Sequence, residues 1–302
     1  MTSAVGRPVR VTSIGFPQLP LDDIVSVVDR EGARGTDLIA LPELCRGWDP
    51  EPLEGPTVSA MSGLARKHGT YIVCPIDRLD GARRLNSAVL VERDGRVACV
   101  YDKIYPYWGE LTDISPAASP GGEMPVYQAD FGRVAMAICF DVNFPELWEE
   151  MSAKGCELVI WPSAYSAGMS LYAHSLMYHY YIVTCTQRCD CIICDITGEE
   201  MLYERGEGIN VTRATLDLDR CLFHLDFNPP KLERLLADHG DDVEVERTLD
   251  REGWFLLRAK RSGVSARELA REYGMEELRD YISRSLRQID EIRGAPFVAS
   301  PR

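Results

Sequence analysis

The chain has 302 residues, of which 45% are hydrophobic and 26% are charged. This composition is ordinary for a globular protein, and the length allows one large layered domain or two smaller ones. Lys and Arg together number 33 and Asp and Glu together number 47, which gives a net charge of −14. An acidic chain argues against non-specific binding to nucleic acid or anionic membranes, because both require a basic surface.

The ten cysteines bear on the compartment in which the protein works. The N-terminal sequence "MTSAVGRPVRVTSIGF" lacks the apolar core and the small-residue cleavage site of an export signal, and no apolar run is long enough to span a membrane. Cysteines in such a chain are more often reduced thiols than disulfides. We therefore predict a cytoplasmic protein with no membrane partner.

Predicted strands and helices alternate along the first part of the chain. The predicted elements are a strand at 9–16, a helix at 21–35, a strand at 37–43, a helix at 57–69, a strand at 70–76 and two strands within 83–103. The last two fold back at "RDGR", because an Asp-Gly pair between apolar runs is typical of a hairpin. Residues 106–125 are rich in Pro, Gly and Ser, and a loop of that length tends to be functional.

The alternation continues in the middle of the chain. The predicted elements are strands within 124–140, a helix at 146–155, a strand at 156–164, a helix at 170–181 and strands at 181–188, 189–196 and 208–219. Helices interleaved with buried strands predict an α/β domain in which helices cover the sheets.

The composition changes near residues 227–230, so we divide the chain into a domain of residues 1–220 and a C-terminal extension of residues 221–302. In the extension, four apolar residues recur at helical spacing: Leu278, Ile282, Leu286 and Ile289. This helix either packs on its own domain or docks on a neighbouring subunit. The stretch "ARELAREYGMEELRDYI" also resembles a helix-turn-helix, but the acidic charge of the chain argues against DNA binding.

Three residues suited to nucleophilic catalysis each end an apolar run. Glu43 ends "DLIALPE", Lys103 ends "ACVYDK" and Cys139 ends "VAMAIC". A thiol becomes a useful nucleophile when a base removes its proton and a positive group stabilises the oxyanion that it creates. Glu43 is suited to the first task and Lys103 to the second, and ligand sites in layered α/β folds gather at strand ends.

A histidine base is the alternative, because catalytic triads assemble in space rather than along the chain. None of the five histidines lies in a local catalytic motif; they are His68, His174, His179, His224 and His239.

Four segments, taken in order, resemble the nitrilase superfamily of carbon–nitrogen hydrolases. They are "LIALPELCRGW" with Glu43, "VYDKIYPYWGE" with Lys103 and Glu110, "ICFDVNFPEL" with Cys139, and "GCELVIWPSAY" after it. The resemblance covers residues 9–219.

The resemblance implies a four-layer αββα sandwich, to which the helix predicted within residues 221–302 adds a C-terminal helical extension. Such sandwiches usually associate in pairs, so we expect a homodimer or a higher homo-oligomer. The resemblance also implies that no metal and no organic cofactor is needed. It makes Cys139 the nucleophile and Glu43 its general base, while Lys103 and the backbone N–H of Phe140 hold the oxyanion. Glu110 orients the substrate or polarises the site.

The chain departs from the family pattern in ways that bear on the substrate. Phe140 replaces the Trp that follows the cysteine in true nitrilases, which favours amides over nitriles, and Asn143 stands where many members carry an arginine. The segment "LYAHSLMYHYYIVT" lacks the Arg-Ala-x-Glu-Asn pattern. Tyr107, Trp108 and Tyr165, with Phe140, are candidates to line the pocket, although each is equally compatible with a core or interface position.

The predicted function is hydrolysis of a small-molecule aliphatic amide or N-carbamoyl compound through a thioester. One alternative is a catalytically silent binding or regulatory subunit with the same fold, and another is a nitrilase that acts on nitriles. A carboxylate-bearing substrate would need a basic residue, for which Arg46 and Arg188 are conceivable sources, although a surface position is expected for each.

Four cysteines cluster in "CTQRCDCIIC": Cys185, Cys189, Cys191 and Cys194. Their spacing differs from the paired Cys-x2-Cys knuckles of structural zinc sites. We therefore expect buried thiols rather than a zinc site.

Overall fold

The computed structural model describes residues 5–297. The chain divides into two compact units, and the larger one comprises Val9–Leu216. The smaller one contains residues 5–8 and 217–297 of the described chain.

The first sheet of the larger unit has seven strands in the order β13-β1-β2-β4-β5-β6, with β3 paired to β4. Its strands are β1 (Pro8–Gly15), β2 (Leu38–Ala40), β3 (Glu51–Pro52), β4 (Tyr71–Asp80), β5 (Arg83–Val91), β6 (Val97–Asp102) and β13 (Asn210–Asp217). Strands β1, β2 and β4 run parallel to one another, whereas β4, β5 and β6 form an antiparallel meander. The hairpin predicted at "RDGR" is confirmed between β5 and β6.

The second sheet has six strands in the order β12-β11-β10-β9-β8-β7. Its strands are β7 (Val126–Gln128), β8 (Arg133–Met136), β9 (Leu158–Ser163), β10 (Tyr181–Thr186), β11 (Asp190–Cys194) and β12 (Glu200–Arg205). Strands β8, β9 and β10 are parallel and almost wholly buried, which explains their continuous apolar sequences. Strand β12 was not predicted from the sequence, because its residues are mostly exposed and half of them are charged.

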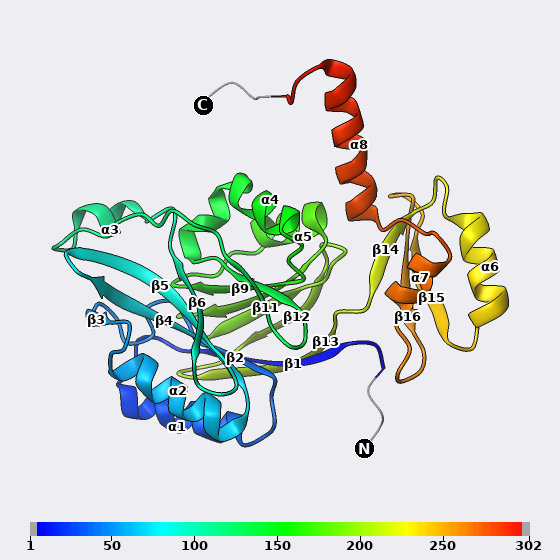
Figure 1. Ribbon diagram of the computed structural model, residues 1–302. Coiled ribbons are helices and arrows are strands. Elements are labelled where there is room, and N and C mark those ends of the chain that lie inside the picture. Colours follow the sequence, from blue (N-terminus) through cyan, green and yellow to red (C-terminus); the bar gives the residue numbers. More distant parts are fainter. Residues whose placement is uncertain (1–4, 298–302) are drawn as a thin grey trace. The chain divides into compact units, whose positions relative to one another are not determined.

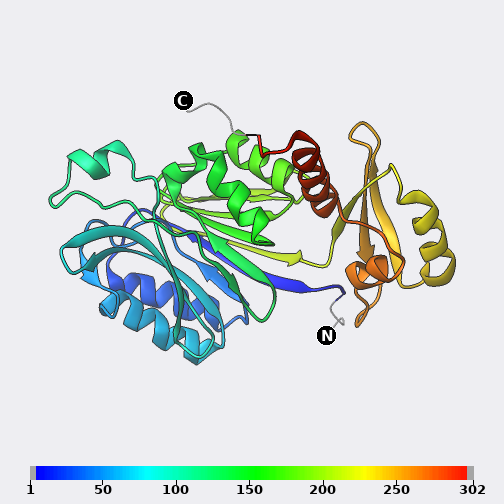
Figure 2. The same ribbon diagram turned by 45° about the horizontal axis from the view of Figure 1, so that its top comes forward.

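Two pairs of helices form the outer layers of the larger unit (Figure 1). The first sheet is covered by α1 (Leu21–Gly32) and α2 (Pro56–His68), which pack on each other. The second sheet is covered by α4 (Pro145–Ala153) and α5 (Met169–Tyr178). Figure 2 shows the same succession of layers after rotation. This arrangement confirms the predicted αββα sandwich.

Side chains between the two sheets fasten them together. Ser13 Oγ on β1 donates to the carbonyl of Thr184 on β10 at 2.7 Å. The thiol of Cys185 lies 3.0 Å from the carbonyl oxygen of Ile14 and 3.1 Å from that of Ala40. Because both carbonyls belong to the first sheet and Cys185 to the second, this cysteine packs between the sheets.

The smaller unit contains strands as well as helices. A three-stranded antiparallel sheet has the order β14-β16-β15, where β14 is Cys221–His224, β15 is Val243–Leu249 and β16 is Trp254–Ala259. Its helices are α6 (Pro229–His239), α7 (Ala266–Glu272) and α8 (Leu278–Arg293). The sequence analysis predicted a helical extension, and the structure adds this sheet to it. The alternating sequence "VEVERTL" carries the strand period, which its high charge obscured.

Helix α8 presents most of its apolar residues to solvent. Leu278 is buried, but Ile282, Leu286 and Ile289 are each about half exposed. The predicted helix is confirmed, whereas docking on a neighbouring subunit stays a prediction. No helix within residues 5–297 combines the length and the apolar character needed to cross a membrane.

Candidate active site

Glu43 lies in the turn that follows β2, where the chain leaves the first sheet. Glu43 is only 3% exposed, and the next residue, Leu44, has a positive φ of 46°. The side chain of Gln187 donates to the Glu43 carbonyl at 2.7 Å and thereby fixes this turn. The strand end predicted from "DLIALPE" therefore places a carboxylate inside the protein rather than at its surface.

Lys103 follows β6 and is buried beside two carboxylates. Its Nζ donates to Glu43 Oε1 at 2.8 Å and to Glu110 Oε2 at 2.6 Å. Burial alone would lower the pKa of Lys103, but the negative charges of Glu43 and Glu110 outweigh it and raise this pKa above its usual range. Lys103 therefore carries a fixed positive charge at neutral pH.

Glu110 lies in α3 (Trp108–Thr112), a short helix in the long loop that the sequence predicted to be functional. Besides Lys103, its Oε2 accepts a hydrogen bond from the backbone N–H of Tyr107 at 2.6 Å. This second bond ties the side chain to the start of its own helix. The Glu110 carboxylate thus connects this loop to Lys103.

Cys139 begins a 3-10 helix (Cys139–Asn143) just after β8. It has a φ of 48°, in the left-handed region that non-glycine residues rarely adopt, and the residue is 8% exposed. Burial and the charge of Glu43 raise the pKa of the thiol to about 12, and the opposite effect of Lys103 offsets only part of this. The resting thiol is therefore protonated and needs a base.

Asn86 on β5 completes the charged cluster, and the sequence analysis missed it. Its Nδ2 donates to Glu43 Oε1 and to Glu110 Oε1, both at 2.8 Å. Its Oδ1 is buried and has no hydrogen-bond partner among residues 5–297. The signal in the sequence was a polar pair inside the apolar strand "RLNSAVLV".

The second sheet contributes a backbone donor to the same cluster. Ala164, which follows β9, donates its N–H to Glu43 Oε2 at 2.8 Å. Glu43 therefore accepts hydrogen bonds from Lys103 and Asn86 on one oxygen and from Ala164 on the other. Residues of both sheets thus set the orientation of one carboxylate.

Asp141 joins the Cys139 turn to the segment that carries Lys103. Its carboxylate accepts from Ile138 N–H at 2.8 Å, from the Tyr101 hydroxyl at 2.7 Å and from Tyr105 N–H at 3.0 Å. Burial raises the pKa of Asp141 to about 7, although the hydrogen bonds from Tyr101 and Ile138 favour the ionised form. This residue lies inside the recognised motif, but the sequence alone indicated no role for it.

The four predicted pocket residues fall into two groups. Phe140 packs edge-on against Tyr107 with ring centroids 5.9 Å apart, and Tyr107 contacts Trp108 at 5.2 Å. Trp108 is the most exposed of them, at 59%. Tyr165 packs on Trp161, and burial together with the charge of Glu43 raises its pKa to about 12. Contact of these rings with substrate stays a prediction.

Two of the remaining candidates, Arg46 and His174, contact residues outside the cluster. Arg46 pairs with Asp49 and donates to Thr57, and Arg188 is exposed. His174 stacks on Trp148 with centroids 4.3 Å apart, and its Nε2 lies 2.8 Å from the Val142 carbonyl oxygen.

Two of the clustered cysteines, Cys185 and Cys189, contact different parts of the chain. Cys185 lies between the sheets, whereas Cys189 Sγ is 3.1 Å from the Gly208 carbonyl oxygen. No group of three or more His, Cys, Asp or Glu residues within 5–297 is arranged to hold a metal ion.

A sequence model described as carbon-nitrogen hydrolase matches residues 21–221. The chain belongs to the carbon-nitrogen hydrolase family. The match includes Glu43, Lys103, Glu110 and Cys139, whose side chains the fold brings together.

Curated relatives are similar over part of their length. A hydrolase of Schizosaccharomyces pombe is 29% identical over 44% of this chain and 46% of its own length. An omega-amidase of Xenopus tropicalis is 26% identical over 48% of this chain and 58% of its own length. A beta-ureidopropionase of Arabidopsis thaliana is 27% identical over 47% of this chain and 39% of its own. The chain thus spans about half the length of the curated relatives that it matches.

Solved structures show the same fold at low sequence identity. An amidase of the nitrilase superfamily from Nesterenkonia superposes with a TM-score of 0.63 at 20% identity, over 72% of this chain and 93% of its own. A Saccharomyces cerevisiae member of the superfamily gives a TM-score of 0.61 at 20% identity, over 79% of this chain and 97% of its own.

Proposed function

We propose that the protein hydrolyses the C–N bond of a small amide or N-carbamoyl compound, with Cys139 as the nucleophile. The observation that carries the proposal is the buried cluster in which Lys103 donates to both Glu43 and Glu110 beside the Cys139 thiol. Such a cluster supplies a base, a fixed positive charge and a nucleophile in a site that largely excludes water.

The reaction begins with proton transfer, because the thiol is protonated at rest. Glu43 takes the Sγ proton as the sulfur attacks the carbonyl carbon. The oxyanion that forms is stabilised by the Lys103 ammonium and by the backbone N–H of Phe140. Glu43 then gives its proton to the leaving nitrogen, ammonia or an amine departs, and a thioester remains on Cys139.

The second half of the reaction restores the enzyme. Glu43 takes a proton from water, the resulting hydroxide attacks the thioester carbon, and the C–S bond breaks. The carboxylic acid leaves, and Cys139 regains its proton from Glu43. Glu110 holds Lys103 and orients the substrate, and the rings of Tyr107, Trp108, Phe140 and Tyr165 line its path.

The relatives support this reaction class. The matched proteins include an omega-amidase and a beta-ureidopropionase. In a mutant of the Nesterenkonia amidase, the acetamide moiety of fluoroacetamide is covalently added at the active-site cysteine. These are properties of those proteins, and they favour an amide-type substrate for this chain.

The test is ammonia release from a panel of primary amides, N-carbamoyl compounds and nitriles. We expect release from an amide or N-carbamoyl compound, abolished in Cys139→Ala and in Glu43→Gln and retained in Cys99→Ala, a control cysteine outside the cluster. Activity that survives Cys139→Ala would refute the mechanism. A silent wild type whose Cys139 resists alkylation would favour the alternative of a binding subunit.

We also propose the wider setting of this activity. Residues 1–220 form the hydrolase domain and residues 221–302 an extension, which accords with the family match and with the division of the structure after Leu216. The working form is a homodimer or larger homo-oligomer in the cytoplasm. Light scattering of the purified chain tests the oligomeric state, and a monomer at working concentration would refute the proposed homo-oligomer.

A further inference from the structure

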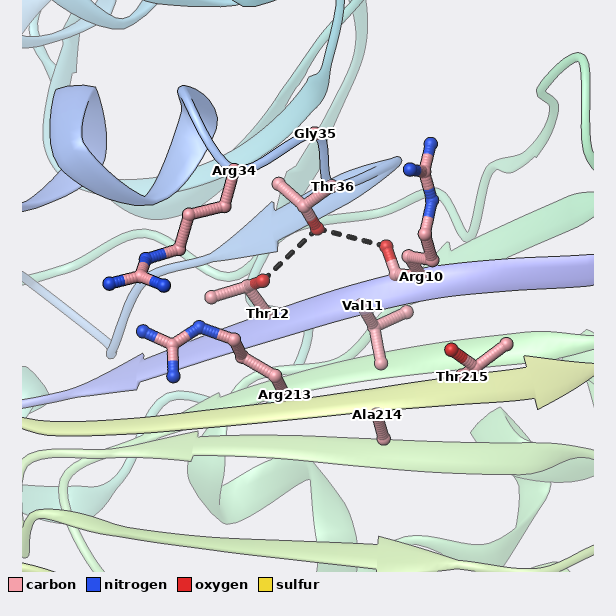
Figure 3. Close-up of a pocket in the computed structure, with 9 residues that line it drawn as sticks. All are labelled: Arg10, Val11, Thr12, Arg34, Gly35, Thr36, Arg213, Ala214 and Thr215. Atoms are coloured by element: carbon pink, nitrogen blue, oxygen red, sulfur yellow. Dashed lines mark hydrogen bonds between the residues drawn. The ribbon is translucent and has the colours of Figure 1, made fainter. Parts of the chain in front are cut away.

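A separate cavity of about 270 Å³ lies in the larger unit, at the opposite end of the parallel strands from Glu43. Its lining comes from three segments of the chain, namely β1, the turn after α1 and β13: Arg10, Val11, Thr12, Arg34, Gly35, Thr36, Arg213, Ala214 and Thr215. Thr36 precedes β2, whereas Glu43 follows it. Figure 3 shows the guanidinium groups of Arg34 and Arg213 on the same side of this cavity.

A buried carboxylate anchors these two arginines. Glu31 is 1% exposed, and its Oε2 accepts from Arg213 Nε at 2.8 Å and lies 3.4 Å from Arg34 Nε. Arg30 Nε pairs with the other oxygen at 3.0 Å. Burial would raise the pKa of Glu31, but hydrogen bonds from Arg213 and Arg30 outweigh it and keep this pKa below its usual range. The anchor is thus ionised at neutral pH.

The cluster has more positive charge than its anchor neutralises. Three guanidinium groups share the single Glu31 carboxylate, so two positive charges lack a matching carboxylate within the cluster. Arg10 differs, because it makes a bidentate pair with Asp37 at 2.9 and 3.1 Å. This local excess occurs in a chain whose net charge is −14.

The arginines also retain unused donors. Among residues 5–297, neither Nη nitrogen of Arg34 donates to a protein acceptor, and Nη1 of Arg213 does not either. A guanidinium group presents paired N–H donors that match the oxygens of a phosphate or a carboxylate. The two arginines therefore offer several donors to one anion.

The floor of the cavity is fixed by hydroxyl groups and a glycine. Thr12 Oγ1 donates to Thr36 Oγ1 at 3.0 Å, and Thr36 Oγ1 donates to the Arg10 carbonyl at 2.9 Å (Figure 3). Gly35 has a φ of 79°, which lets the chain turn from Arg34 back to the strand. The backbone conformation at Arg34 is therefore fixed before any ligand binds.

We propose that this cavity binds a small oxyanion, with a phosphate or carboxylate group held between the guanidinium groups of Arg34 and Arg213. The ligand relieves the repulsion between two like charges that Glu31 holds close together. The volume leaves room for a small organic group beyond the anionic one.

The test is calorimetric titration of the full chain with inorganic phosphate, pyrophosphate and succinate, which separates phosphate from carboxylate recognition. We expect saturable binding of at least one anion, weakened about tenfold or more in Arg34→Gln, since a hydrogen bond to a charged group contributes enough for that change. Arg213→Gln should weaken binding similarly. Arg96→Gln is the matched control, because Arg96 is an exposed, ion-paired arginine that does not line the cavity.

Three results would overturn the proposal. These are the absence of saturable binding for all three anions, binding that Arg34→Gln leaves unchanged, and equal weakening in Arg96→Gln. Arg213→Gln removes a partner of the buried Glu31 and can fail to fold. In that event Arg34→Gln decides alone, because it leaves Glu31 paired with Arg30 and Arg213.

Discussion

Asn86 Nδ2 lies 2.8 Å from Glu43 Oε1, so a strand-interior amide restrains the carboxylate assigned as the general base. The same nitrogen donates to Glu110 at the same distance. A carboxylate at position 86 would face the carboxylates of Glu43 and Glu110, whereas the Asn86 amide donates a hydrogen bond to each of them. Asn86 is therefore a positioning residue for the two glutamates.

We predict that Asn86→Asp lowers kcat about a hundredfold, because small misplacements of catalytic groups have effects of that size. Repulsion from the new carboxylate should displace Glu43. Steady-state kinetics on the best amide checks this, with Asn210→Asp as a control in which the same change is made on β13. Wild-type kcat in Asn86→Asp would show that the contact is dispensable.

Lys103→Met should reduce the free energy of unfolding by about 3–5 kcal/mol, as expected when one partner of a buried ion pair is removed. The side chain lies between Glu43 and Glu110, which would be left without their cation. Urea unfolding measures the loss. A double variant with Glu110→Gln should recover stability without activity, and failure to recover it would contradict the assigned pairing.

Asp141 gives stability a particular pH dependence. Its pKa is about 7 in the folded protein and 3.8 in the unfolded chain, so between these values the folded state holds a proton that the unfolded state has released. The contribution of Asp141 to the free energy of unfolding is complete below the pKa of the unfolded chain and is lost as the pH rises to about 7. We predict that Asp141→Asn removes this fall, as measured by urea unfolding at pH 5 and pH 7.5. Parallel pH profiles of the two proteins would contradict it.

We predict that the thiol of Cys185 contributes to packing between the sheets and does not bind a metal ion. Cys185→Ala is expected to lower the free energy of unfolding by about 1–2 kcal/mol, through a small cavity and two lost contacts with carbonyls. Cys99→Ala, in a half-buried position, should cost less. EDTA should leave Tm unchanged, and a drop in Tm together with bound zinc by elemental analysis would revive the zinc alternative.

The sequence predicted the residues that end apolar strands and missed those inside them. Glu43, Lys103 and Cys139 stand out because a polar group follows a buried run. Asn86 sits within β5, where one polar residue looks like ordinary alternation, and only the three-dimensional arrangement shows that it faces two carboxylates. The arginine cavity was missed for a related reason, since Arg34 and Arg213 are far apart along the chain.

The two sheets carry different halves of the proposed machinery. Glu43 and Lys103 follow strands of the first sheet, whereas Cys139 and Ala164 follow strands of the second. Any sliding of one sheet over the other therefore separates the base from the nucleophile before either sheet loses its own hydrogen bonds. The rate of hydrolysis should therefore be sensitive to the relative position of the two sheets. We expect activity to be lost at urea concentrations at which circular dichroism still reports intact strands and helices.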